Sequence, residues 1–240
     1  MEYPKLSIIT PIFERNKFKR LIITNLLNLD YPLDKIEYII DDDGKEEKFI
    51  NNLEELNEFK EAIAPIQFIY KHYQKKREIG EKRNNLVKLA TNKLIAQMDS
   101  DDFMLSSWLK YGVEEMKNNK LQLVGTNQMI FIFPNNDWKT TAIQCGEKRM
   151  IHEAGMIFTK KHWKAMGGFK KSSQGEGTNM IDGMNPKTIG LLYCNKVMIC
   201  ICHDNNTIDK ARFLDLKDLN AHTQLTNYDK DLILSSISSC

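Results

Sequence analysis

The fold is decided by the stretch Ile36-Glu37-Tyr38-Ile39-Ile40-Asp41-Asp42-Asp43-Gly44, in which a buried strand runs directly into an acidic turn. β-Branched and aromatic residues favour the strand, and the glycine favours the turn. The same order of apolar strand and polar cluster occurs at 6–13 and again at 94–102. In the first case Thr10-Pro11-Ile12-Phe13 follows the strand, and in the second Asp99-Ser100-Asp101-Asp102 follows it.

Segments with the periodicity of an amphipathic helix lie between these strands. Apolar residues recur on one helical face at 18–29, near 49–56 and around 86–90, and a further strand is predicted at 66–70. Repeated strand and helix units of this length favour a mainly parallel sheet with helices on both faces. The sequence therefore predicts an α/β fold, a Rossmann-like α/β/α arrangement of three layers.

The second half of the chain is less regular. Its apolar runs at 121–124, 129–133, 156–159 and 197–202 are separated by polar loops, and we expect them to add mixed strands to the same core. A length of 240 residues with 42% hydrophobic content fits one sizeable core. We therefore predict a single domain, 1–240.

The amino-acid composition excludes few classes of protein. A net charge of +2 neither demands nor excludes an anionic polymer, and we expect no nucleic-acid partner. The five cysteines are odd in number and form no Cys-x-x-Cys pair, which indicates a reducing compartment rather than a disulfide framework. The apolar runs are too short for a signal peptide or a transmembrane segment. We expect a soluble, cytoplasmic protein.

The polar clusters carry the chemistry, because parallel sheets bind ligands outside the carboxyl ends of their strands. The clusters at 10–13, 41–44 and 99–102 would share one edge, although any one of them alone fits an ordinary turn or helix cap. Together, so many carboxylates would repel one another unless a cation or hydrogen-bond donors lay among them. A hard divalent metal ion is the simplest solution.

These motifs resemble those of family 2-type GT-A glycosyltransferases, in the same order and over nearly the whole chain. The resemblance includes the strand ends at 7–13 and 39–44, and the Gly-x-x-Arg-Asn segment at 80–84. It continues with Asp99-Ser100-Asp101 as an Asp-x-Asp motif, the strand at 154–158 and the Gly-Gly-Phe turn at 167–169. It implies a GT-A fold with a nucleotide-sugar-binding half, 1–105, and an acceptor-binding half, 106–240.

The resemblance also implies roles for single residues. Those expected at the nucleotide sugar are Thr10, Pro11, Phe13, Asp42, Asp43, Arg83, Asp99 and Ser100, with Asp43 as the main contact of the base. Asp101 is the expected main ligand of Mn²⁺ or Mg²⁺, assisted by Asp99 and His203. For His203, a cap at the end of the strand at 197–202 is an equally open interpretation.

Inverting members of the family use the Asp of a Glu-Asp pair after the Gly-Gly-Phe turn as base. Here Glu176 is followed by Gly177, so the expected Asp is missing. Glu176 is the first candidate, Asp182 is the second, and a variant that uses neither stays open. His152 and Glu153 could reach the acceptor or form an ordinary surface pair.

The resemblance implies transfer of a sugar from a nucleotide-diphosphate sugar, by default a UDP-sugar, to a glycan, protein or small-molecule acceptor. A binding protein that has lost transfer is the main alternative, because Gly177 replaces the base. A sugar nucleotidyltransferase would need a glycine-rich loop after the first strand, which residues 10–15 lack. A receiver-like domain would be about half as long.

Overall fold

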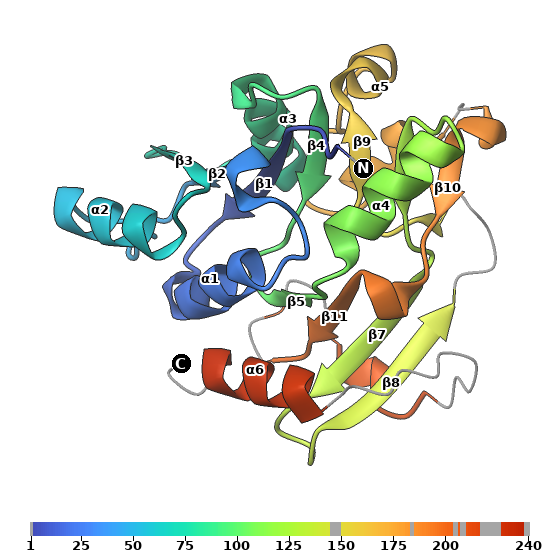
Figure 1. Cartoon of the computed structure of the whole chain (residues 1–240). Helices are drawn as coiled ribbons and strands as arrows, with labels where there is room; N and C mark the ends of the chain where they lie inside the picture. The colour runs from blue at the N-terminus through green and yellow to red at the C-terminus, as the bar shows by residue number, and fades with distance from the viewer. Residues whose placement is uncertain are drawn as a thin grey trace.

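The computed structural model describes residues 2–144, 150–182, 185–203, 206, 210–216 and 227–237. Within these ranges, a seven-stranded sheet has the order β10-β6-β9-β4-β1-β2-β3 (Figure 1). Its strands are β1 (Leu6–Ile12), β2 (Ile36–Asp42), β3 (Gln67–His72), β4 (Leu94–Gln97), β6 (Leu123–Gly125), β9 (Ile157–Thr159) and β10 (Ile189–Leu191).

Most of this sheet is parallel. β1 runs parallel to β2 and to β4, and β2 runs parallel to β3, whereas β9 runs antiparallel to β4 and β6. The chain steps outward from β1 to β3 and then returns to place β4 on the other side of β1. This reversal is a topological switch point, where the loops after β1 and β4 diverge and leave room for a ligand.

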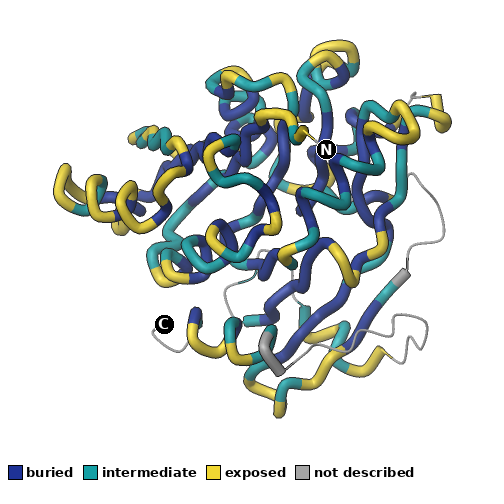
Figure 2. The backbone as a smooth tube through the Cα atoms, in the orientation of Figure 1, coloured by how far each residue is buried: buried dark blue, intermediate teal, exposed yellow. Residues whose placement is uncertain are grey.

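Helices cover both faces of the sheet, as predicted. Neighbouring strand residues point to opposite faces, so Ile8 and Ile40 pack in one core while Ile9 and Ile39 pack in the other. The helices of the first core are α1 (Lys19–Leu27), α2 (Leu53–Ala62) and α4 (Trp108–Asn118); those of the second are α3 (Ile79–Leu89) and α5 (Lys160–Ala165). Figure 2 shows the strands as buried segments between partly exposed helices. The three-layer α/β/α architecture is thus confirmed.

One predicted helix begins later than its apolar pattern indicates. Phe49 and Ile50 lie in the loop before α2, where they are 0% and 5% exposed. The helix begins after Asn52, whose side chain accepts a hydrogen bond from the Glu55 N–H at 2.9 Å. The two apolar residues therefore belong to the core, and the capping side chain sets the start of the helix.

The second half of the chain builds a second sheet as well as completing the first. Within the described residues its order is β5-β11-β7-β8, formed by β5 (Asp102–Met104), β11 (Met198–Ile201), β7 (Gln128–Phe133) and β8 (Lys139–Gln144). Ile130 and Ile132 of β7 pack with Phe18 and with Ile233 of α6 (Asn227–Ile237), which lies beside α1 (Figure 1). The expected mixed strands therefore divide between two sheets. One face of β7 and β11 packs in this further core, whereas Phe131 and Cys200 on the other face join the first core.

Three further expectations concern the chain as a whole. The division at residue 105 falls between β5 and α4, and it stays a prediction. Cys194, Cys200 and Cys202 are buried free thiols, and Cys145 and Cys240 lie outside the described residues. Across the part of the chain that the structure describes, no helix combines the length and apolar character needed to cross a bilayer. The cytoplasmic location stays a prediction.

Candidate active site

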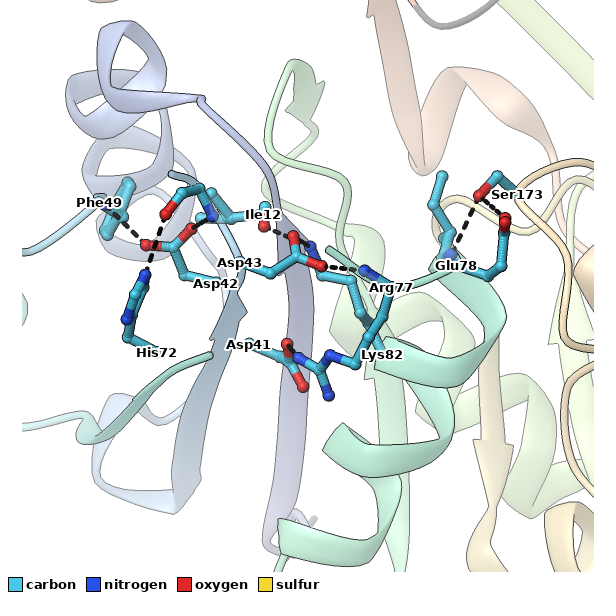
Figure 3. A network of polar contacts seen from close by, with 12 residues as sticks. Ile12, Asp41, Asp42, Asp43, Phe49, His72, Arg77, Glu78, Lys82 and Ser173 are labelled. Carbon is cyan, nitrogen blue, oxygen red and sulfur yellow. Dashed lines mark hydrogen bonds and ion pairs between the residues drawn. The ribbon is translucent and has the colours of Figure 1, made fainter. Parts of the chain in front are cut away.

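The acidic turn after β2 lies beside the end of β1. Ile12 is paired with Asp42 in the parallel ladder, and the Asp43 N–H donates to the Ile12 carbonyl at 3.2 Å. Asp41, Asp42 and Asp43 are all fully buried. Figure 3 shows Asp42 pointing toward Phe49, whereas Asp41 and Asp43 point toward the side of the sheet covered by α3. The three carboxylates therefore do not form one cluster.

Asp42 stabilises the turn itself. Its carboxylate accepts hydrogen bonds from the Gly44 N–H at 2.9 Å, the Phe49 N–H at 2.8 Å and the Tyr70 hydroxyl at 2.7 Å. Burial, followed by the hydrogen bond to Asp42, raises the pKa of Tyr70, which keeps this hydroxyl a donor. The structure thus gives Asp42 a local role in holding the loop that leads to α2.

Asp43 forms a buried ion pair with Lys82 of α3. Lys82 Nζ lies 2.5 Å from Asp43 Oδ1 and also contacts the Ile12 carbonyl, while the Arg77 N–H donates to Asp43 Oδ2 at 2.7 Å. Burial lowers the pKa of Lys82, and the hydrogen bond to Asp43 opposes that shift. Arg77 also binds Asp41 and stacks on Tyr73, with its guanidinium carbon 3.8 Å from the ring centroid.

The Gly-x-x-Arg-Asn segment opens α3 and holds the Gly-Gly-Phe turn. A Cβ on Gly80 would lie 1.8 Å from the Lys170 carbonyl oxygen, so only glycine allows this approach. Asn84 Oδ1 accepts from the Trp163 indole at 2.8 Å and from the Phe169 N–H at 2.9 Å, and Asn84 Nδ2 donates to the Phe169 carbonyl at 2.8 Å. Two motifs that are far apart in the sequence therefore form one unit.

Arg83 connects that unit to the turn after β4. Its guanidinium lies 2.9 Å from Asp99 Oδ1 and 3.2 Å from Glu176 Oε1. The Arg83 side chain is 4% exposed, that of Glu176 6% and that of Asp99 28%. Burial alone would lower the pKa of Arg83, but the neighbouring carboxylates of Asp99, Glu176 and Glu153 raise it. Burial raises the pKa of Glu176, against the effect of Arg83.

Asp101 lies at the end of the same turn, next to His203 from the loop after β11. Asp101 Oδ2 is 3.2 Å from His203 Nε2 and 3.5 Å from Asn206 Nδ2. Burial alone would raise the pKa of Asp101, but the hydrogen bond from His203 and the charge of Lys210 lower it to about 2. Asp101 is therefore an ionised carboxylate next to an imidazole.

Two cavities meet at this turn. The first, about 240 Å³, is rich in cationic side chains and is lined by Pro11, Phe13, Arg15, Lys76, Arg77, Ile79, Lys82, Arg83, Asp99, Ser100, Asp101 and Ser173. The second, about 450 Å³, is wider and more apolar, and its polar lining includes Asp102, His152, Glu153, Lys210 and Arg212. Asp99 and Asp101 line both cavities.

The chain is similar to known proteins both in sequence and in fold. The model for glycosyl transferase family 2 matches residues 7–181. The chain belongs to glycosyl transferase family 2. Residues 1–349 of S. aureus TarS in complex with UDP superpose with a TM-score of 0.65 at 16% identity, over 82% of this chain and 60% of that chain. A search of curated proteins gives no match.

A second similar structure is the mannosyltransferase PcManGT from Pyrobaculum calidifontis in complex with GDP-Man and Mn²⁺. It superposes with a TM-score of 0.63 at 13% identity, over 89% of this chain and 59% of that chain. At such low identity the likeness shows the fold, which is of the predicted GT-A type. The chain spans about three fifths of the length of both structures.

The structure brings many of the predicted family 2 site residues together. Pro11, Phe13, Arg83, Asp99, Ser100 and Asp101 line the first cavity, and His203 lies against Asp101. Thr10 and Asp43 are fully buried and line neither cavity, and Asp42 faces the loop before α2. Glu176 is buried against Arg83, and Asp182 is exposed; neither is part of the lining of the two cavities.

The sequence interpretation missed the cations of the first cavity. Arg15, Lys76, Arg77 and Lys82 all line it. The sequence does carry a signal for them, because the basic run Lys75-Lys76-Arg77 begins three residues after the end of β3. Positive side chains at a strand end beside a helix N-terminus are expected where an anion binds.

The chemistry of the Asp101 site fits a hard divalent cation. An ionised carboxylate and an imidazole are both common ligands of Mn²⁺, and carboxylate oxygens suit Mg²⁺. Among the described residues, however, no three His, Cys, Asp or Glu side chains converge on one point that could hold a metal ion. A cation here would need further oxygen ligands from a bound substrate, which a diphosphate supplies.

Proposed function

We propose that the chain transfers a hexosyl group from a nucleoside-diphosphate sugar to an acceptor hydroxyl, with inversion at the anomeric carbon. A UDP-sugar is the first candidate donor, and the acceptor is a glycan, a protein or a small molecule. The main support is that Asp99 and Asp101 line both a cationic cavity and a wider neighbouring cavity. A donor whose diphosphate lies in the first would present its sugar to an acceptor in the second.

The first cavity suits a nucleoside diphosphate. Phe13 offers an aromatic face for the base, and Lys76 Nζ lies 3.8 Å from the centroid of its ring. Arg15 and Lys76 add positive charge where the diphosphate would lie. Negative charge grows on the leaving diphosphate as the bond to the sugar breaks, and losing one group placed to stabilise such charge typically raises the barrier by about 2.7–4 kcal/mol.

Asp101 and the neighbouring His203 would hold Mn²⁺ or Mg²⁺, and Asp99 of the same turn would assist. When bound, such an ion acts as a Lewis acid that stabilises the departing diphosphate. The hydrogen bonds that surround Asp101 keep its carboxylate ionised and oriented. The presence of Mn²⁺ with GDP-Man in the PcManGT complex supports this assignment.

Thermal unfolding tests the proposal most directly. The protein is heated with UDP, GDP, CDP or dTDP, each with and without Mn²⁺. A ligand at 100 times its dissociation constant adds about 2.7 kcal/mol of stability, which raises the melting temperature measurably. We expect a metal-dependent rise with one nucleotide that is lost in Asp101→Asn. If no nucleotide raises the melting temperature, the proposed donor site is wrong.

A binding protein without transferase activity is the second candidate. Gly177 favours it, because the residue expected to act as base is missing. Both functions predict nucleotide binding, so hydrolysis of a bound donor distinguishes them. Release of a nucleoside diphosphate from a sugar nucleotide in the presence of Mn²⁺ supports the transferase. Tight binding without any release supports the binding protein.

A further inference from the structure

Gly177 lies directly against the side chain of Glu153. A Cβ added to Gly177 would lie 2.5 Å from Glu153 Cγ and 3.1 Å from Glu153 Oε1. The Gly177 N–H also donates to Glu153 Oε1 at 3.2 Å. The glutamate therefore occupies the space into which a side chain at position 177 would project.

The fold holds Glu153 firmly at this place. Gln97, at the end of β4, donates from its side-chain amide to the Glu153 carbonyl at 2.9 Å. The Gln97 carbonyl accepts from the Gly155 N–H at 3.1 Å, and Gly155 has a φ of +76°, which favours glycine. These contacts place Glu153 next to the end of β4, which leads into the turn with Asp99 and Asp101.

Glu153 also faces the second cavity, in which an acceptor would bind. It lines the second cavity together with Asp99, Asp101 and His152. Its side chain is only partly buried, whereas that of Glu176 is 6% exposed and paired with Arg83 at 3.2 Å. Of these two glutamates, Glu153 is thus the one open to an acceptor, and Glu176 is placed to position Arg83.

We propose that Glu153 is the catalytic base of this chain and takes the place of the aspartate that Gly177 lacks. This inference rests on the proposed transferase function. The acceptor oxygen forms a bond to the anomeric carbon, and the bond from that carbon to the diphosphate oxygen breaks. The bonding electron pair leaves with the diphosphate, and the hydroxyl proton passes to the Glu153 carboxylate. No oxidant or other co-reactant is needed.

The experiment measures release of nucleoside diphosphate with Mn²⁺ and water as acceptor, from UDP-glucose, UDP-galactose, UDP-GlcNAc and GDP-mannose. Removing a general base typically slows the reaction by about 10²–10⁴-fold. We expect Glu153→Gln to lower kcat by at least about 100-fold while the Kd for the free nucleotide changes less than about twofold. Glu58→Gln, an exposed substitution on α2, is the matched control and is expected to behave like the wild type.

A second pair of variants tests whether the two positions share one space. In Glu153→Ala the base is lost, and adding Gly177→Asp supplies a carboxylate where space has been opened. The double variant is expected to recover at least about tenfold in kcat over Glu153→Ala, a part of the usual effect of a general base. A purely structural role of Glu153 would not give such recovery, and absence of any gain would refute the shared position.

The outcomes separate the two proposals. If the wild type releases nucleotide and Glu153→Gln retains its kcat within about threefold, well short of the loss of a base, Glu153 is not the base although the transferase function stands. If Glu176→Gln loses kcat while Glu153→Gln does not, the proton goes to Glu176. Wild-type protein that acts on none of the four donors and is stabilised by none of the four nucleotides refutes the transferase function itself.

Discussion

Replacement of Lys82 by methionine removes a buried charge at the floor of the first cavity. The Lys82 side chain is 3% exposed, that of Asp43 is fully buried, and Lys82 Nζ lies 2.5 Å from Asp43 Oδ1. Breaking a buried ion pair by removing one partner costs about 3–5 kcal/mol, because the other charge stays buried. Methionine keeps most of the side-chain volume, so we expect Lys82→Met to lower the free energy of unfolding by that amount.

A double-mutant cycle separates the pair from its surroundings. Asp43→Asn leaves the Lys82 ammonium without its carboxylate, and a cost similar to that of Lys82→Met is expected. With both substitutions no unpaired charge remains, so the double variant should be clearly more stable than the sum of the single losses predicts. Contacting residues typically show coupling energies of about 0.5–3 kcal/mol.

Urea unfolding followed by tryptophan fluorescence measures all four proteins. Lys88→Met is the matched control, because Lys88 is exposed on the same helix, and such a change is expected to stay within about 0.5 kcal/mol of the wild type. A loss below about 1 kcal/mol in Lys82→Met, or additive single effects within about 0.5 kcal/mol, would refute the buried pair.

Three further predictions concern other parts of the molecule. Gly80→Ala should lower the midpoint of urea unfolding, because the clash of the new Cβ with the Lys170 carbonyl costs about 1–3 kcal/mol and outweighs the gain in helix propensity. An unchanged midpoint would contradict this close approach. Phe13→Ala should weaken binding of the preferred nucleotide by about 1–3 kcal/mol in titration calorimetry if the ring stacks on the base, and equal affinity contradicts the stacking. Burial lowers the pKa of His162 below its value of 6.5 in the unfolded chain, so the stability that the neutral imidazole contributes is full above pH 6.5 and declines as the pH falls. His162→Gln should therefore make the free energy of unfolding less dependent on pH, measured between pH 5 and 8.

The order of strands and helices was predictable because each signal is local. Alternating burial of Ile8 and Ile9, or of Ile39 and Ile40, follows from strand geometry once both faces are covered. The start of α2 was less predictable, because the capping side chain of Asn52 outweighs the apolar pattern of Phe49 and Ile50. The second sheet as a whole could not be predicted, because β11 pairs with β5 and β7, which are distant in the sequence, and only the hairpin of β7 and β8 is local.

The sequence was enough to predict which turns meet at the site, but not the direction in which each side chain points. Strand ends of a parallel sheet share one edge, which placed the turns after β1, β2 and β4 together. Consecutive aspartates point to alternate sides of the sheet, so Asp42 faces Phe49 while Asp43 faces Lys82. The contact between Gly177 and Glu153 joins a short 3₁₀ helix (Glu176–Met180) to a loop, and only the folded chain reveals it.

From the sequence alone, a metal ion is expected because neighbouring carboxylates repel one another and need a cation to compensate their charge. The folded chain supplies most of that compensation itself: Arg77 binds Asp41, Lys82 binds Asp43 and Arg83 binds Asp99. Repulsion among carboxylates therefore no longer requires a metal ion. Asp101 is the residue that favours a metal ion, because it is ionised, lies beside His203 and lines both cavities. A metal ion at Asp101 would consequently respond to the diphosphate of the donor, and its affinity should rise when a nucleotide is bound.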